Sequence, residues 1–299
     1  MEPIQGNVSI DAQNIMPIIK KWLYSDKDIF IREVVSNGCD AITKLRMVDS
    51  AAAQGCSIHV EVDKAACELR FIDDGVGMTE DEVKTNINQV AFSGAKSFME
   101  EYAKNEDKEN SGIIGHFGLG FYSVFMIADK VTIDTLSFRE GATPVRWESE
   151  DGMAFTMTEG TRTARGTTIT LHVSEAESEF LEVWRVREVL DRYCSFMSVP
   201  IYLDEIKEEE AKVTGEGAEE KPEAEKEAPK PINDTQPLYA RAPQDCRDED
   251  YKQFLCAFYA EAIAGTLQDY IMHPQERSRE RVVYYLERLL RSTLPAAVQ

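Results

Sequence analysis

The segment between residues 205 and 230 most limits what this chain can fold into. Its sequence, EIKEEEAKVTGEGAEEKPEAEKEAPK, contains ten Glu and five Lys but almost no large apolar side chain. Such a segment cannot bury enough apolar surface to offset the entropy lost on ordering. We therefore predict a charged, disordered linker here, preceded by a folded domain over residues 1–204.

The composition excludes several classes of protein. The chain has 299 residues, of which 43% are hydrophobic, and this is enough for one large or two modest cores. Its formal net charge is -21, so its surface repels phosphate backbones and nucleic-acid binding is not expected. The six cysteines form no CxxC pair and no His/Cys cluster, and neither a signal peptide nor a membrane span is recognisable. We expect a cytoplasmic protein without a disulfide framework, a zinc site or membrane contact.

Hydrophobic periodicity predicts a domain of the α+β class. Helical spacing of apolar residues is found near 14–24, 28–48, 79–88, 95–104 and 178–197. Alternation typical of strands is found near 57–62, 67–72, 130–136, 144–149, 153–158 and 166–173. Most of the later strands are separated only by turn-length gaps. This favours a mixed, mostly antiparallel sheet in a two-layer sandwich with helices on one face.

The predicted helix EVVSNGCDAITKLR (33–46) has a polar face. Glu33, Asn37 and Asp40 occupy positions i, i+4 and i+7, which places two carboxylates and an amide on one side of the helix. Gly38 interrupts the middle of this helix at a cost of about 1 kcal/mol relative to Ala. The alternative to a binding role is a solvated helix face that carries a helix-breaking Asn.

The stretch CELRFIDDGVGMTEDEV (67–83) runs from a predicted strand into a glycine-containing turn. Gly75 and Gly77 permit a positive φ or close approach of a ligand to the backbone. Thr79 and Glu82 have the spacing of a capping box and predict the start of a helix. Asp73 at the strand end is suited to accept a hydrogen bond from an exocyclic amine, although a plain surface turn has the same composition.

A second glycine-rich stretch, GIIGHFGLGFYS (112–123), precedes the predicted helix FYSVFMIA. Free N–H groups and the helix dipole make such a loop suitable for phosphate. The stretch matches neither the Walker A pattern nor GxGxxG, and a flexible loop is the alternative reading. The polar region from 88 to 115 fits either a mobile lid over a ligand or a surface excursion.

Taken in order, the polar helix, the DxGxG turn, the lid-like region and the GxxGxG loop resemble the Bergerat-type ATP site of the GHKL superfamily. The stretches SDKDIFIREVVSNGCDAITKLR, DDGVGMT, SGAKSFMEE and IGHFGLGFYSVFMIADKV are similar to the ninety-kilodalton heat-shock chaperone family, especially its bacterial HtpG type. The resemblance is dense over residues 1–204, and residues 231–261 resemble the start of the middle domain of that family. Residues 262–299 are left unassigned, with RVVYYLERLLRSTL expected to form an amphipathic helix.

The resemblance implies binding of ATP or ADP together with Mg²⁺. Glu33 matches the carboxylate that activates the attacking water, and Asn37 matches the magnesium ligand. Asp73 matches the acceptor of the adenine amino group. The remaining implied positions are Asp40 near the nucleotide, Gly77 and Thr167 in water-mediated contacts, Met78 and Asn86 beside the base and ribose, and, through their amides, Gly115, His116, Phe117, Gly118, Leu119, Gly120 and Phe121 at the phosphates.

The sequence departs from the family pattern near the phosphates. Phe92 stands where the family usually has a Lys that reaches a phosphate, and this loss is expected to weaken phosphate binding by about 1–3 kcal/mol. Lys96 is a candidate replacement for that cation. His116 and Leu119 replace a Gln and a Val of the family, and Asn88 replaces a Gly, which is expected to stiffen the hinge of the lid.

By this resemblance the chain is the N-terminal region of an ATP-dependent chaperone that assists unfolded or partly folded client proteins. The family is homodimeric, but its dimerisation domain and the middle-domain Arg that contacts the γ-phosphate have no counterpart in these 299 residues, so slow hydrolysis is expected. One alternative is a catalytically impaired nucleotide-binding or interaction module from a truncated paralogue. A histidine kinase or a gyrase- or MutL-type ATPase is disfavoured, because no helix with a phospho-acceptor His precedes the site and the chain is acidic.

Overall fold

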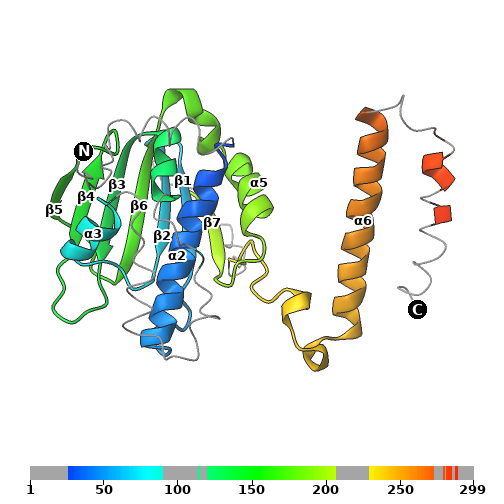
Figure 1. Cartoon of the computed structure of the whole chain (residues 1–299), viewed down its shortest axis with the longest axis horizontal. Helices are drawn as coiled ribbons and strands as arrows, with labels where there is room; N and C mark the ends of the chain where they lie inside the picture. The colour runs from blue at the N-terminus through cyan, green and yellow to red at the C-terminus, as the bar shows by residue number, and fades with distance from the viewer. Residues whose placement is uncertain are drawn as a thin grey trace, which may run out of the picture. The chain divides into compact units, whose positions relative to one another are not determined.

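The computed structural model describes residues 26–89, 114, 120–206, 229–272, 279, 281–284 and 287–288 (Figure 1). The chain divides after Thr235 into two compact units. The helices predicted near 14–24 and 95–104 lie outside the described residues. Within the described part of the chain, no helix combines the length and the apolar character needed to cross a membrane.

A mixed sheet forms the centre of the first unit. Over the described residues it has seven strands in the order β5-β4-β3-β6-β2-β1-β7. All neighbouring pairs are antiparallel except β1 and β7, which are parallel. The strands are β1 (Ile58–Asp63), β2 (Glu68–Asp73), β3 (Ala128–Leu136), β4 (Val145–Ser149), β5 (Thr156–Glu159), β6 (Gly166–Val173) and β7 (Ile201–Glu205). The predicted α+β fold with a mostly antiparallel sheet is confirmed.

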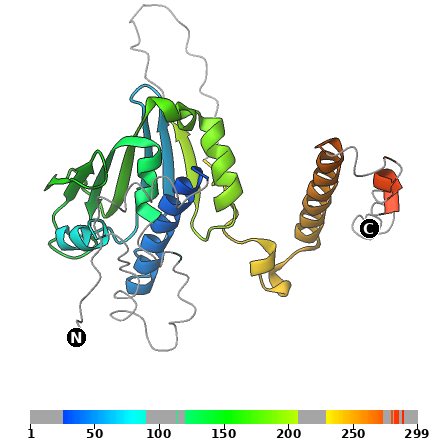
Figure 2. The same ribbon diagram turned by 45° about the horizontal axis from the view of Figure 1, so that its top comes forward.

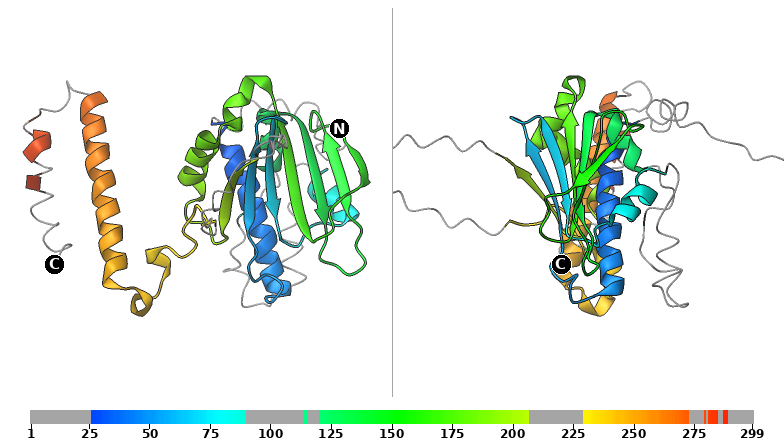
Figure 3. Two further views of the ribbon diagram at one scale, coloured as in Figure 1. Left: turned by 180° about the vertical axis from the view of Figure 1, so that it is seen from behind. Right: turned by 90° about the vertical axis from the view of Figure 1, so that its left-hand side faces the viewer.

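Helices cover one face of this sheet, and the right-hand view of Figure 3 shows α2 along that face. Figure 2 shows η2 beside α2, which it contacts. The helices of the first unit are α2 (Ile29–Val48), α3 (Glu80–Asn86) and α5 (Val183–Cys194), with the 3₁₀ helices η2 (Gly120–Met126) and η3 (Glu175–Leu181). The stretch predicted as a helix after Gly120 is therefore a 3₁₀ helix. The predicted helix near 178–197 is divided in two, because the backbone of Glu182 is extended.

The core lies between the sheet and these helices. Along β1 and β2 the side chains alternate between buried and partly exposed, so Val60 and Phe71 face the helices. Phe30 of α2 meets Phe71 and Phe180 edge to face, with ring centroids 6.3 and 5.1 Å apart. Each buried aromatic side chain contributes about 1.5–3 kcal/mol. These contacts fix α2 over β2.

Strand β7 was not predicted. Its sequence IYLDE is short, and its last residue, Glu205, was assigned to the charged linker. The strand pairs in parallel with β1, with Ile201 opposite Ile58. A parallel partner distant in sequence leaves no hairpin signal, so the local pattern was not sufficient to identify this strand.

The chain returns to β7 after the predicted linker. The N–H of Ile232 donates to the carbonyl of Ile201 at 2.8 Å. The buried side chain of Asn233 accepts from the N–H of Ile201 and donates to the carbonyls of Met197 and Val199, each at 2.9 Å. Residues 232–234 therefore pack on the first unit, although the sequence grouped them with the segment 231–261.

The longest element in the described part of the second unit is one helix. Two short 3₁₀ turns, η4 (Leu238–Ala240) and η5 (Pro243–Asp245), precede α6 (Asp248–Met272). The helix continues without a break through the position between 261 and 262 where the sequence placed a boundary. On α6 the exposed rings of Phe254 and Phe258 stack with centroids 6.4 Å apart.

Candidate functional site

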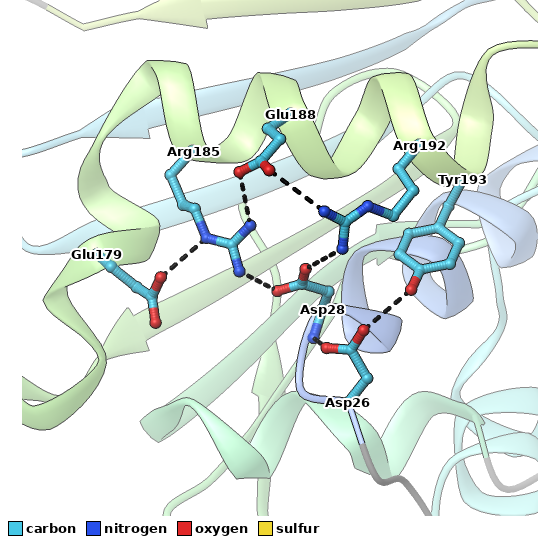
Figure 4. Close-up of polar contacts among 7 residues, drawn as sticks. All are labelled: Asp26, Asp28, Glu179, Arg185, Glu188, Arg192 and Tyr193. Carbon is cyan, nitrogen blue, oxygen red and sulfur yellow. Dashed lines mark hydrogen bonds and ion pairs between the residues drawn. The ribbon is translucent and has the colours of Figure 1, made fainter. Parts of the chain in front are cut away.

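An ion-pair network fixes the first turn of α2 to α5 (Figure 4). The side chain of Asp28 is 4% exposed and pairs with both Arg185 and Arg192, the latter at 3.2 Å. Glu188 bridges the two guanidinium groups at 2.9 and 3.2 Å. Asp26 accepts from the N–H of Asp28 at 3.0 Å. This network holds the start of the helix that carries the predicted polar face.

The three polar side chains of α2 have different surroundings. Glu33 is partly buried, pairs with Arg32, and lies so close to Gly120 that a Cβ at that position would overlap its Oε2 atom. Asn37 is exposed. Asp40 is buried and accepts from the N–H of Ile114 at 2.7 Å. The polar face is therefore a set of positioned groups and not a uniformly solvated surface.

Gly38 allows α2 to approach the ends of β1 and β2. A Cβ on Gly38 would lie 3.0 Å from Cδ1 of Ile58 and 3.5 Å from Cβ of Asp73. The turn after β2 is equally close, because a Cβ on Gly75 would lie 2.5 Å from Cβ of Ala41. These contacts provide a reason for a glycine in the middle of the helix: α2 and the DDGVG turn share one tightly packed wall.

Asp73 ends β2 and points into this wall. It is 9% exposed, and its Oδ1 accepts from the N–H of Gly75 at 2.8 Å. Burial raises the pKa of Asp73 to about 7. The N–H groups of Gly75 and Thr167 and the charge of Arg162 lower this pKa, but their effect is smaller than that of burial. A carboxyl group that titrates near neutral pH inside a packed wall is typical of a functional position.

Gly77 is a second position in the turn where only glycine fits. Its φ is +60°, and a Cβ there would overlap the carbonyl oxygen of Leu136. The next residue, Met78, donates its N–H to the hydroxyl of Thr135 at 3.0 Å, and its side chain packs partly buried on the core. The turn is thus fastened to the end of β3.

Thr135 connects several predicted residues and was itself missed. Its hydroxyl lies 3.0 Å from that of Thr167 and 3.1 Å from the carbonyl of Gly166. Thr167 is also the register partner of Asp73 across β2 and β6. Met78 and Thr167 therefore meet at one buried hydroxyl group, and Thr167 connects this group to Asp73. The sequence offered no signal for Thr135 because the contact depends on strand register.

Lys44 is a second residue that the sequence reasoning missed. It lies one turn after Asp40 on α2, and burial lowers its pKa while Asp40 and Glu82 raise it. The i, i+4 spacing from Asp40 was the available signal. A partly buried cation beside the polar face is suited to an anionic ligand.

The start of the region predicted as a lid is held by two aromatic side chains. Asn86, at the end of α3, is partly buried. The Nε1–H of Trp147 donates to Oδ1 of Asn88 at 2.9 Å, and the hydroxyl of Tyr122 donates to the carbonyl of Ile87 at 2.5 Å. Asn88 is thus anchored to β4 in place of the glycine that the family resemblance implied.

The predicted phosphate-binding residues are described only in part. Gly120 starts η2, and the ring of Phe121 is buried against Trp147 with centroids 5.8 Å apart. Phe92, Lys96, Gly115, His116, Phe117, Gly118 and Leu119 lie outside the described residues.

The described residues are compatible with a Mg²⁺ ion that takes most of its ligands from a bound nucleotide and from water. In the described parts of the chain no group of three or more His, Cys, Asp or Glu residues is arranged to hold a metal ion. Mg²⁺ at nucleotide sites keeps several waters and takes its other ligands from one or two protein oxygens and the phosphates. The exposed amide of Asn37, between Glu33 and Asp40, has an oxygen that would suit this purpose.

The comparisons with known proteins agree with this geometry. The family described as "Histidine kinase-, DNA gyrase B-, and HSP90-like ATPase" matches residues 28–152, which include α2, the DDGVG turn and β3. The "Chaperone protein HtpG" of Porphyromonas gingivalis W83 is 41% identical over 263 residues, which cover 85% of this chain and 36% of that protein. The proteins of the same name from Bacteroides thetaiotaomicron and Geobacter metallireducens are 43% and 36% identical over 260 and 252 residues. These cover 85% and 82% of this chain, and 36% and 39% of the relatives.

The chain thus spans little more than a third of the length of these relatives. The predicted resemblance to HtpG chaperones is confirmed, and it extends over most of the chain. The family model thus matches the part of the chain that carries α2 and the DDGVG turn, and the sequence is similar to the HtpG chaperones over most of its length.

Proposed function

We propose that this chain binds ATP and ADP with Mg²⁺ and acts as the nucleotide-binding region of an HtpG-like chaperone. The observation that carries the proposal is the packing of α2 on the end of β2. Gly38 and Gly75 bring the polar face of the helix and the buried carboxyl of Asp73 into one wall. A helix face with an exposed amide and a carboxylate, beside a buried hydrogen-bond acceptor, suits a phosphate chain at one end and a base at the other.

The proposed roles follow from the positions of the side chains. Asp73 accepts the adenine amino group, with Gly77 and Thr167 in contact through water. Asn37 contributes the protein oxygen to Mg²⁺, which neutralises phosphate charge when it is bound. Glu33 orients the attacking water and takes its proton.

Several further residues complete the proposed nucleotide site. Asp40 lies near the nucleotide, and Lys44 adds a cation to the same part of α2. Met78 and Asn86 line the base and ribose, and Lys96 replaces the cation missing at Phe92. The phosphate-binding amides are those of Gly115, His116, Phe117, Gly118, Leu119, Gly120 and Phe121.

The wider activity is also a proposal. The relatives are named chaperones and are much longer, so client binding by this chain is proposed from the family. We expect this 299-residue chain to hydrolyse ATP more slowly than a full-length relative. Nucleotide binding without useful hydrolysis is the second candidate function, and Phe92 at the usual Lys position favours it.

The proposed location is the cytoplasm. All six cysteines, Cys39, Cys56, Cys67, Cys194, Cys246 and Cys256, are free thiols. Cys39 and Cys194 are buried, and burial raises the pKa of each to about 12, which keeps them in the unreactive thiol form. Free thiols in a folded domain support a reducing compartment.

The test compares turnover and binding in matched variants. Glu33→Gln is expected to bind ADP within about threefold of the parent and to lower phosphate release by about a hundredfold or more. Asn37→Ala is expected to remove the strengthening of binding by Mg²⁺. Turnover that survives in Glu33→Gln would contradict the proposed catalytic role, and equal Mg²⁺ dependence in Asn37→Ala would contradict the metal role.

A further inference from the structure

The loop between β5 and β6 contains an arginine to which the proposed function gives no role. The guanidinium of Arg162 donates from Nε to the carbonyl of Ala164 at 3.2 Å, and from Nη1 to the hydroxyl of Thr168 at 2.5 Å. Its Nη2 donates to the carbonyl of Arg165 at 3.0 Å and, more weakly at 3.4 Å, to the carbonyl of Asp73. Arg162 thus joins the loop to the residue proposed to recognise adenine.

This loop is held firmly on both sides. On one side, Asp134 of β3 accepts from the N–H and the hydroxyl of Thr161 at 3.0 and 2.5 Å. On the other, Gly166 has a φ of +116°, and a Cβ there would overlap the carbonyl oxygen of Asp73 and lie 2.9 Å from Nη2 of Arg162. Arg162 is therefore a packed part of the wall behind Asp73.

Groups from each neighbouring element face the Asp73 carboxyl. Asp74 follows it in its own turn, and the thiol of Cys39 approaches it from α2. Arg162, from the β5–β6 loop, supplies positive charge, and the N–H groups of Gly75 and Thr167 point to the carboxyl. Burial disfavours the charged form, while Arg162 and the two N–H groups favour it.

We propose that Arg162 is a positioning residue for nucleotide recognition, which is packed behind Asp73 and favours the charged form of its carboxyl. The inference rests on the proposed adenine site. A carboxylate accepts a hydrogen bond from an amine about twice as strongly as a neutral acceptor. The affinity for an adenine nucleotide therefore depends on the ionised fraction of Asp73, and through it on Arg162.

The test measures ADP affinity in the presence of Mg²⁺ between pH 6 and 9 for the parent, Arg162→Gln and Arg162→Lys. Arg187→Gln is the matched control, because Arg187 is exposed on α5 and pairs only with Asp191 among the residues described. Affinities are compared as the ratio of variant to parent at each pH. The titration of the ADP phosphates is common to both samples and cancels in this ratio.

The expected result is a pH-dependent loss. If the glutamine raises the pKa of Asp73 by about one unit, the ionised fraction at pH 7 falls from about one half to about one tenth. Arg162→Gln then binds about fivefold more weakly at pH 7 and equally well at pH 9. Arg162→Lys keeps the charge and is expected to bind closer to the parent at pH 7, while Arg187→Gln shows no change at any pH.

A ratio that is constant across pH would overturn the inference, because a loss of packing alone weakens binding equally at every pH. The same titration with Asp73→Asn separates this outcome from failure of the proposed function. If the parent binds no ADP, or binds it only as well as Asp73→Asn does, the proposed adenine-binding role of Asp73 is contradicted. The inference about Arg162 is then contradicted as well.

Discussion

The carboxylate of Glu33 packs directly on the backbone of Gly120. Any side chain at position 120 would therefore overlap the carboxylate of Glu33 where it now lies. Glu33 comes from the second turn of α2 and Gly120 from the start of η2. The contact joins the proposed catalytic carboxylate to the end of the predicted phosphate-binding stretch.

Gly120→Ala is therefore expected to displace Glu33. ATP turnover should fall about tenfold or more, because a misplaced general base loses part of a contribution of roughly a hundredfold or more. Steady-state phosphate release measures the effect. Gly265→Ala is the control, because a Cβ at that position in α6 meets no atom within 4 Å. Unchanged turnover in Gly120→Ala would show that this contact does not position Glu33.

The buried Asp73 predicts a pH dependence of stability. Its pKa is raised from 3.8 to about 7 in the folded protein, so between these values the native state holds more protons than the unfolded state. The contribution of Asp73 to stability is thus fully present below pH 3.8 and is lost as the pH rises through 7. The free energy of unfolding of the parent should fall across this window by up to about 1.4 kcal/mol per pH unit from this group.

Denaturant unfolding of the parent and of Asp73→Asn between pH 5 and 8 measures this slope. The variant is expected to show a shallower dependence, since it removes the titrating group. Asp129→Asn, at an exposed position of β3, serves as the control and should keep the slope of the parent. Parallel curves for the parent and Asp73→Asn would show that Asp73 is ionised throughout the window.

The hydrogen bonds of the Thr135 hydroxyl predict that an isosteric residue without a hydroxyl cannot replace Thr135. Thr135→Val removes the acceptor of the Met78 N–H and the partner of Thr167. Leaving a buried donor unsatisfied costs about 1–3 kcal/mol, so the melting temperature should fall and ADP binding should weaken. Thr170→Val, a similar change on the partly exposed side of β6, is expected to have little effect on either property. Equal behaviour of the two variants would contradict the role assigned to Thr135.

The hydrogen bonds of the Asn233 side chain predict that residues after the acidic segment contribute to the stability of the first unit. Asn233→Ala removes three hydrogen bonds to the backbone of residues 197–201. At about 1 kcal/mol for each net bond, the free energy of unfolding should fall by about 3 kcal/mol. Thermal unfolding against the exposed control Asp234→Asn measures the difference. A change below about 0.5 kcal/mol would show that this segment is not part of the folded unit.

Local pattern predicted those parts of the fold that depend on neighbouring residues. The alternation of Val60 and Val62 with polar residues in β1, and the capping box of Thr79 and Glu82, both appear in the structure. In the capping box, the N–H of Thr79 donates to Glu82 at 2.8 Å. These features need only side-chain periodicity and one helical turn.

The features that the sequence did not reveal depend on tertiary contacts. Strand β7 has its partner, β1, far away in the chain, and Thr135 acquires its role through strand register. Gly38 is costly in an isolated helix, and its reason appears only when α2 packs on Ile58 and Asp73. The family resemblance supplied the candidate site where residue chemistry alone favoured a surface turn.

In the function that we propose, Asp73 recognises an adenine nucleotide. Calorimetric titration of the 299-residue chain and of Asp73→Asn with ADP and Mg²⁺ at pH 8 tests it most directly, with Asp74→Asn as the matched control. We expect saturable binding by the parent and by Asp74→Asn, and a loss of about tenfold or more in Asp73→Asn, whose amide replaces the charged acceptor. Equal binding by the parent and Asp73→Asn, or no binding by the parent, would contradict it.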